Sequence, residues 1–378
     1  YSCPVPEACL AGGVVPTGAN TSELTLARCA EGYEGTLCAV CADGFFQQFG
    51  RCTPCNTSAG VAWMVTFLVV AVVAVLGALA FKFKALLPVD QLKVTLSMTQ
   101  IIASANTAYE IPWPSAFSDF LDAMRVFLVD AVSLTRASCA QPMTFFASLV
   151  VTLVGFKVVL LVVVTVPVIV HKVKDIAKSM MAAVHAAQAI DWAKIFQVTF
   201  LFLFVAYPGV SLKIMKTFKC VEVEGQFWLV ADMRLKCYEG EWFGYALYAF
   251  VMGCLYTAGL PIAVIVILVR NRRRLDDADV RAKWGFLYET YGSHAYLWEA
   301  VELVRKLWLT ALVVLMEAGT PLQVTVAVLI SGWAHVLHAL YKPWRGVGDV
   351  SGQSVYALQH GSLFVTFFVF LMGLLFKV

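Results

Sequence analysis

Charged residues are scarce in this chain of 378 residues, at 14% of the sequence against about 25% in soluble domains. Hydrophobic residues make up 60%, and the mean hydropathy is +0.77. The net charge of +3 is too small to indicate a nucleic-acid partner. The composition therefore predicts an integral membrane protein in contact with lipids, and no binding of nucleic acid.

The sequence motifs of common enzyme classes are missing. There is no P-loop, no HExxH, no G-x-S-x-G and no Rossmann fingerprint, so we expect neither enzymatic activity nor a cofactor. The sequence starts at Tyr1 without a visible signal peptide, although an extracellular N-terminus normally needs one. We therefore expect a processed product that a larger ectodomain precedes.

Seven of the eleven cysteines lie in the first 55 residues, among Gly, Pro, Asn and Thr, with no apolar run long enough for a core. They are Cys3, Cys9, Cys29, Cys38, Cys41, Cys52 and Cys55. Disulfides would supply the stability that packing cannot, and they persist in oxidising compartments. Asn20 and Asn56 each begin a glycosylation acceptor sequence. Residues 1–57 are thus predicted to be an extracellular, disulfide-rich, glycosylated module.

Residues 29–55 resemble the cysteine modules of laminin-type EGF and ephrin-receptor-like domains. The resemblance lies in a Gly-Tyr-x-Gly turn followed by two CxxC pairs. A zinc ribbon is the rival interpretation of such pairs, but the acceptor sequences favour disulfides over metal. Because seven is odd, one sulfur needs a partner upstream of residue 1 or at Cys139.

Long apolar runs follow the cysteines, and about 20 apolar residues are enough for a spanning helix. We predict an all-α polytopic membrane domain over 58–378 with eight spans, at 59–81, 91–109, 144–170, 195–212, 242–269, 296–316, 321–341 and 355–376. The span at 91–109 has the weakest support because it is rich in Ser, Thr, Gln and Asn. It is retained because the topology fails without it.

The distribution of positive charge supports this topology. Lys and Arg gather in the connections 171–194 and 270–295, as expected for cytoplasmic loops. The outward loops then carry Cys139, Cys220 and Cys237, and we expect a disulfide between the last two. Cys254 lies inside a span and is predicted to be a small buried hydrophobe.

Two further segments have the pattern of helices at the membrane surface. Residues 113–134 place apolar side chains on one helical stripe, and residues 175–192 form an alanine-rich stretch with one polar side. We expect the first on the outer leaflet and the second on the inner surface.

Polar residues recur at helical spacing along the second predicted span. They are Lys93, Ser97, Gln100, Ser104 and Thr107. One interpretation is a helix face lining a hydrated path; the other is hydrogen bonding between packed helices. Lys157, near the middle of the third span, is expected to be neutral, paired or facing a wet cavity.

The sixth span begins with Glu299 and Glu302 one turn apart, and Lys306 follows four residues after Glu302. These residues fit an intrahelical salt bridge or the mouth of a cation path, because hard cations prefer carboxylates. His335 and His338, three residues apart in the seventh span, could bind metal, respond to pH or be structural.

Residues from about 90 onward resemble a family of algal, ciliate and oomycete membrane proteins related to the fungal TRP-like (flavin-carrier) proteins. The matching features are Gln100, the Ile-Pro-Trp-Pro at 111–114, Cys139, Tyr207-Pro208, the Cys220…Cys237 loop, Trp298-Glu299 with Arg305-Lys306, and Lys342-Pro343-Trp344. The resemblance implies a polytopic TRP-like protein of a plasma or ciliary membrane.

Three functions fit these observations. The first is a cation channel or transporter, with its path beside the second span and its inner mouth at Glu299 and Glu302. The second is a non-conducting anchor or subunit whose cysteine module docks an extracellular filament, wall component or protein partner. The third is a lipid-handling protein with a polar groove facing the membrane.

Overall fold

The computed structural model describes residues 8, 29–48, 51–55, 60–61, 64, 89–109, 111–128, 139, 143–180, 192–316, 320–345 and 350–377, and most of these are helical. The chain divides into two compact units. The first comprises Tyr1–Val89, Asp130–Thr152 and Lys213–Met252, and the second Asp90–Val129, Leu153–Leu212 and Gly253–Val378.

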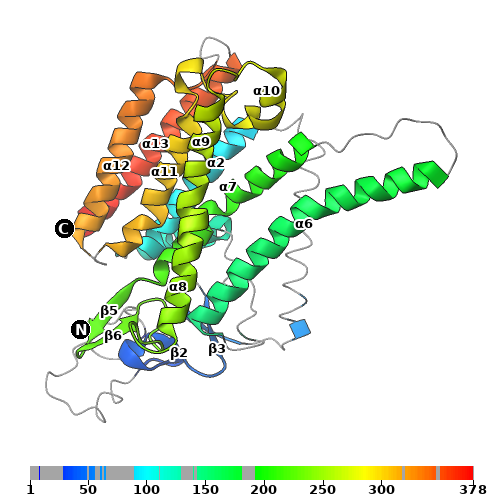
Figure 1. Cartoon of the computed structure of the whole chain (residues 1–378). Helices are drawn as coiled ribbons and strands as arrows, with labels where there is room; N and C mark the ends of the chain where they lie inside the picture. The colour runs from blue at the N-terminus through cyan, green and yellow to red at the C-terminus, as the bar shows by residue number, and fades with distance from the viewer. Residues whose placement is uncertain are drawn as a thin grey trace. The chain divides into compact units, whose positions relative to one another are not determined.

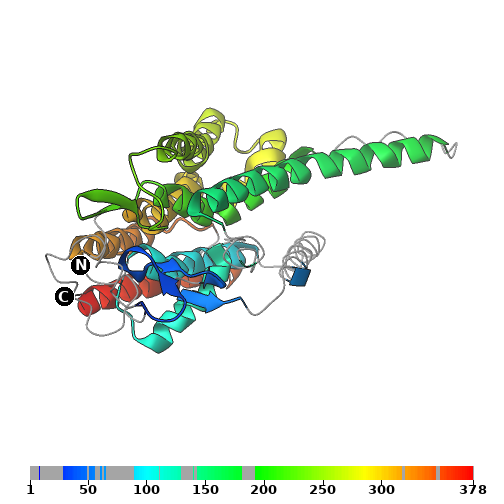
Figure 2. The ribbon, with the colours of Figure 1, turned by 90° about the horizontal axis from the view of Figure 1, so that it is seen from below.

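Short antiparallel hairpins make up the cysteine-rich part of the first unit (blue in Figure 2). Strand β1 (Tyr33–Glu34) pairs with β2 (Val40–Cys41), and β3 (Phe45–Gln48) pairs with β4 (Arg51–Pro54). Such strands are too short to be stable alone. The Cys41–Cys52 disulfide joins β2 to β4, and Cys29–Cys38 joins the chain before β1 to the 3₁₀ turn Thr36–Cys38 between β1 and β2.

A third hairpin in the first unit precedes helix α8 (Trp242–Met252). Its strands β5 (Cys220–Val223) and β6 (Gln226–Leu229) are antiparallel. Glu224 and Gly225 both have positive φ (54° and 75°), which a two-residue turn of this kind requires. The predicted disulfide between Cys220 and Cys237 is present. Leu229, Cys237, Trp242 and Ala246 are buried in one cluster with Phe146.

Helices make up the second unit. This unit contains α2 (Val89–Ala108) except for its first residue. The helices that lie wholly within it are α3 (Ser115–Met124), α9 (Gly259–Asn271), α10 (Ala278–Trp284), α11 (Trp298–Thr310), α12 (Pro321–Tyr341) and α13 (Val350–Lys377). Helices α6 (Phe145–Met180) and α7 (Trp192–Lys216) belong partly to each unit. Figure 1 shows α12 and α13 side by side, with α11 next to them.

Five helices are long and apolar enough to cross a membrane: Phe145–Val173, Ile195–Lys216, Trp242–Asn271, Pro321–Tyr341 and Gln353–Lys377. They correspond to five of the eight predicted spans. Helix α2 is not among them because its polar residues lower its hydropathy, and α11 is only 13 residues long before the chain continues as a 3₁₀ turn, Leu312–Leu315. The predicted span 59–81 lies almost wholly outside the described residues.

The structure corrects the prediction for Cys254, whose side chain is exposed. It lies in a π-helical turn, Gly253–Ala258, between α8 and α9. Thr257 in this turn cannot receive the usual helical bond from position 261, because Pro261 has no N–H. The hydroxyl of Tyr207 donates to the Thr257 carbonyl instead, at 2.7 Å. The π turn thus directs Cys254 outward while its buried side is fixed by Tyr207.

The expected surface helices are found in part. Helix α3 and the following 3₁₀ turn Arg125–Leu128 occupy most of 113–134. Leu121 and Leu128 are buried, whereas Phe120 and Phe127 are exposed, so only part of the apolar stripe packs against protein. Helix α6 extends through Met180 into the alanine-rich segment, and residues 181–191 of that segment lie outside the described part.

Gly209 in α7 is a position where only a glycine fits. A Cβ there would lie 1.7 Å from the carbonyl oxygen of Leu128, whereas a Cβ at Gly155 in α6 would meet nothing within 4 Å. We expect Gly209→Ala to lower the free energy of unfolding by about 1–3 kcal/mol, because it forces two main chains apart. Gly155→Ala, the control, should be neutral or stabilise by up to about 1 kcal/mol. Thermal unfolding in detergent measures both, and equal shifts for the two variants would contradict the packing.

Candidate functional site

The polar face of α2 is covered by protein. Gln100 and Ser104 are fully buried, and Ser97 is 6% exposed. The side-chain amide of Gln100 donates to the carbonyls of Phe127 (3.0 Å) and Val205 (2.9 Å). Hydrogen bonding between packed helices, the second sequence-based interpretation, therefore describes this face in the present conformation.

The other hydroxyls of that face make no bond to a neighbouring helix: Ser104 and Thr107 bond within α2, and the Ser97 hydroxyl is buried without a partner. The hydroxyl of Ser104 donates to the carbonyl of Ile101, and that of Thr107 donates to the carbonyl of Ser104. Lys93 forms an ion pair with Glu299 of α11 at 3.0 Å. The five residues therefore do not line a common hydrated space in this conformation.

Glu299 is the centre of a buried polar contact between α2 and α11. Its carboxylate is paired with Lys93 and also accepts the hydroxyl of Tyr291 at 2.9 Å. The residue is only 5% exposed. A buried carboxylate needs both charge compensation and hydrogen bonds, and these two partners supply them.

Glu302 has a different partner from the one that the sequence suggested. Its carboxylate pairs with Arg305, three residues later, at 2.6 Å, rather than with Lys306. It also accepts the side-chain amide of Gln359 from α13 at 3.2 Å. The two glutamates are thus each held by cations of the protein, so in this conformation they are not an open mouth for free cations.

Lys157 lies on an exposed face of α6. Leu153 and Leu161 lie about one helical turn before and after it. Leu161 is exposed, as are the neighbours Val154 and Val158, whereas Leu153 is buried. The sequence-based alternatives for Lys157, a neutral, paired or cavity-facing side chain, stay predictions. Its exposure separates this residue from the buried face of α2.

The disulfides include a bond between Cys55 and Cys139 (Cα–Cα 5.6 Å) that spans 84 residues. Cys139 was one of the two partners expected for the odd cysteine. Cys3, Cys9, Asn20 and Asn56 lie outside the described residues. The bond ties the end of the cysteine-rich segment to the stretch of chain between α3 and α6.

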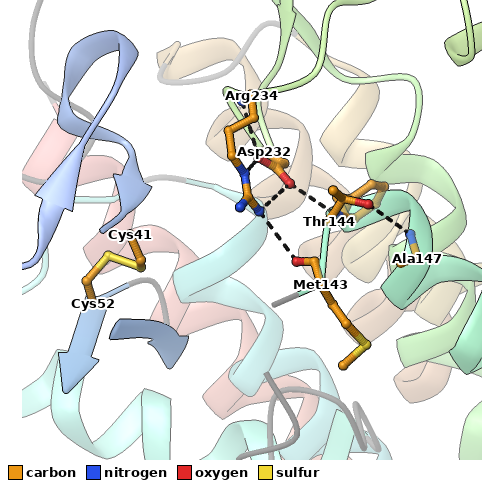
Figure 3. A network of polar contacts seen from close by, with 8 residues as sticks. Cys41, Cys52, Met143, Thr144, Ala147, Asp232 and Arg234 are labelled. Carbon is orange, nitrogen blue, oxygen red and sulfur yellow. Dashed lines mark hydrogen bonds and ion pairs between the residues drawn. A yellow bond between two sulfur atoms is a disulfide. The ribbon is translucent and has the colours of Figure 1, made fainter. Parts of the chain in front are cut away.

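The loop after β6 holds the beginning of α6. Asp232 accepts the main-chain N–H of Phe145 at 3.0 Å, while the hydroxyl of Thr144 accepts that of Ala147. Figure 3 shows this network close to the Cys41–Cys52 disulfide. A carboxylate at a helix N-terminus is favourable because it satisfies free N–H groups and faces the positive end of the dipole.

Arg234 holds Asp232 in this position through a two-pronged contact, with distances of 2.8 and 2.9 Å (Figure 3). The hydrogen bond to Asp232 raises the pKa of the Arg234 guanidinium above its ordinary value. In the sequence, Asp232 and Arg234 are only two opposite charges two residues apart. Their role as a helix cap needed the tertiary structure because Phe145 and Asp232 are 87 residues apart.

An apolar groove of about 430 Å³ lies in the first unit, lined by Val150, Gly244, Tyr245 and Tyr248. Its walls suit acyl chains, whereas the lipid-handling hypothesis requires a polar groove for headgroups. Among the described residues, no group of three or more His, Cys, Asp or Glu side chains is placed to hold a metal ion.

Comparison with known proteins gives one short similarity. Part of the chain is similar to "Cysteine repeat modular protein A" of Toxoplasma gondii, with 23% identity over 113 residues. The match covers 28% of this chain and 4% of that protein. No family model matches the chain, and no solved structure matches it.

The Lys93–Glu299 pair gives a direct test of the buried contact. Lys93→Met should lower the free energy of unfolding by about 3–5 kcal/mol, because it leaves the Glu299 carboxylate buried without its cation. Adding Glu299→Gln should recover most of that loss. Arg274→Ala, which removes an exposed ion pair with Asp277, is the control and should cost about 1 kcal/mol or less. Thermal unfolding of all four proteins in detergent is the measurement, and a double variant as unstable as Lys93→Met alone would contradict the pairing.

Proposed function

We propose that this chain is a membrane anchor that holds a disulfide-crosslinked module at the outer surface of a cell. The observation that carries the proposal is the Cys55–Cys139 disulfide. It connects the cysteine-rich segment covalently to a second point of the chain, beyond the first two predicted spans. A force on the module would therefore be transmitted to the membrane domain at two places instead of one.

Three further features support an anchor. The polar face of α2 is used for helix packing, so the part of the sequence that favoured conduction is engaged in stabilising contacts. The crosslinked hairpins are typical of an oxidising space. The similar Toxoplasma protein is described as a cysteine repeat modular protein, which fits a chain built to present cysteine-rich modules.

In this proposal the membrane domain has eight spans and an extracellular N-terminus, glycosylated at Asn20 and Asn56, in a plasma or ciliary membrane. The five long apolar helices support the membrane domain. The module would dock an extracellular filament, a wall component or a partner protein.

Pulling on a single molecule tests the two-point attachment. With the full chain in a nanodisc and a handle upstream of Cys29, reduction of the disulfide or Cys139→Ser should release an additional contour length. The sequence separation of 84 between the cysteines corresponds to about 290 Å of extended chain. Cys254→Ser, which affects no described disulfide, should leave the force trace unchanged. A Cys139→Ser trace identical to that of the native protein would exclude a tethering role for this bond.

Cation conduction by a TRP-like protein is the second candidate function. The paired charges of Lys93, Glu299, Glu302 and Arg305 on two neighbouring helices favour it, because ionisable groups inside a membrane often mark ion pathways. Opening would require these pairs to separate, so the conformation described here would be a closed one.

A flux assay distinguishes the two functions. The anchor proposal expects proteoliposomes with the full chain to show no more monovalent or divalent cation flux than protein-free vesicles. Flux that Glu302→Gln changes at least tenfold, while Asp277→Asn does not, would favour conduction and reject a purely passive anchor. Gln100→Leu is unsuitable for this purpose because it removes two hydrogen bonds of a buried amide and would destabilise the fold whether or not the protein conducts.

A further inference from the structure

Three imidazoles meet between α12 and α13. The rings of His335 and His360 have centroids 4.3 Å apart, and those of His338 and His360 are 5.9 Å apart. The sequence suggested a relation between His335 and His338 only. His360 joins them because α13 packs along α12 over much of its length (Figure 1). We call these three residues the histidine cluster.

The nitrogens of the histidine cluster are buried without protein partners. His338 is fully buried, and neither of its ring nitrogens has a hydrogen bond. The Nδ1 atoms of His335 and His360 are also buried and without a partner. An unsatisfied polar group in apolar surroundings costs free energy. Four such atoms in one place therefore indicate a site that takes up something from outside.

Aromatic rings and one ion pair surround the cluster. Tyr356 stacks on His338 at 4.8 Å, and the indole ring of Trp298 in α11 lies 6.3 Å from it. The charged groups that act on His338 are Glu302 and Arg305, both of α11. Gln359 of α13 donates to Glu302, so that carboxylate is held toward the helix that carries His360.

We propose that the histidine cluster is a proton-binding site of the membrane domain that holds a single proton shared by its three imidazoles. A proton from water adds to one free ring nitrogen and converts that imidazole into an imidazolium, with no other bond formed or broken. A second imidazolium at ring distances of 4.3–5.9 Å would be repelled by the first, since two like charges in one site cannot both be favourable.

The position of the cluster gives this proton a structural effect. His335 and His338 lie in the last two turns of α12, and His360 lies in the third turn of α13, so the cluster is near the connection between the two helices. A positive charge placed there would attract Glu302 and repel Arg305, which are paired with each other at 2.6 Å. Proton binding would thereby weaken this pair within α11, whose Glu302 also accepts a hydrogen bond from Gln359 of α13, and make the membrane domain responsive to pH.

Nitrogen-15 NMR of the full chain in nanodiscs, labelled at histidine, tests the proposal. Spectra recorded between about pH 8 and pH 5, where an ordinary imidazole gains its proton, are referenced to the signal of His294, an exposed histidine outside the cluster. The three cluster signals together should account for about one imidazolium. They should change over the same pH interval, because a shared proton belongs to the set.

Variants separate sharing from independent titration. His360→Gln removes the central ring and should abolish the common transition, so that His335 and His338 no longer change together. His294→Gln, the matched control, should leave the cluster at one proton. Spectra of each variant at pH 8 establish that it is folded, and the NMR count of the native chain tests the proposal even if His360→Gln does not fold.

Three results would overturn the proposal. Full conversion of all three cluster imidazoles in parallel with His294 would mean independent sites. No conversion at all down to pH 5 would mean that the cluster is structural. A shift of the cluster signals at pH 8 on adding Zn²⁺, reversed by a chelator, would make the cluster a metal site in place of a proton site.

Discussion

Hydrogen bonds from buried side chains to main-chain carbonyls of other segments are the interaction on which the helical unit depends. Gln100 donates to Phe127 and Val205, and Gln323 donates to Ala108 and Val313. Packed helices shield such groups from water, so buried donors need partners inside the protein. The polar residues of α2 are therefore what fixes this helix among its neighbours.

The need of buried polar atoms for hydrogen-bond partners also divides the polar residues into two groups. Those with partners contribute to helix packing, and those without partners require another explanation. Tyr207 and Glu299 have partners of matching chemistry, and so does the amide nitrogen of Gln100, whereas the Gln100 Oε1 atom has none. In the histidine cluster, four buried ring nitrogens have no partner. In the sequence, both kinds of residue are polar side chains within predicted helices. Only the presence or absence of hydrogen-bond partners in the structure distinguishes them.

Covalent and capping contacts have the corresponding role in the first unit, where hydrophobic packing is limited. Disulfides connect strands that are too short to persist alone, and Asp232 with Arg234 caps α6 from a loop far away in sequence. The Cys55–Cys139 bond extends this crosslinking across the chain. A small core is thus compensated by bonds that restrict the chain, which suits a module exposed to force or to partners.

The sequence by itself determined the class of the protein, because the two properties that define it are local. An apolar run of about 20 residues indicates a membrane-spanning helix, and a high density of cysteines indicates a disulfide-rich module. It located five apolar helices and the Cys220–Cys237 crosslink. Tertiary structure alone decided that Gln100 packs against carbonyls, that Lys93 pairs with Glu299, and that His360 joins His335. These contacts connect residues on different helices, and their pairing depends on the rotation and packing of each helix, which no local pattern specifies.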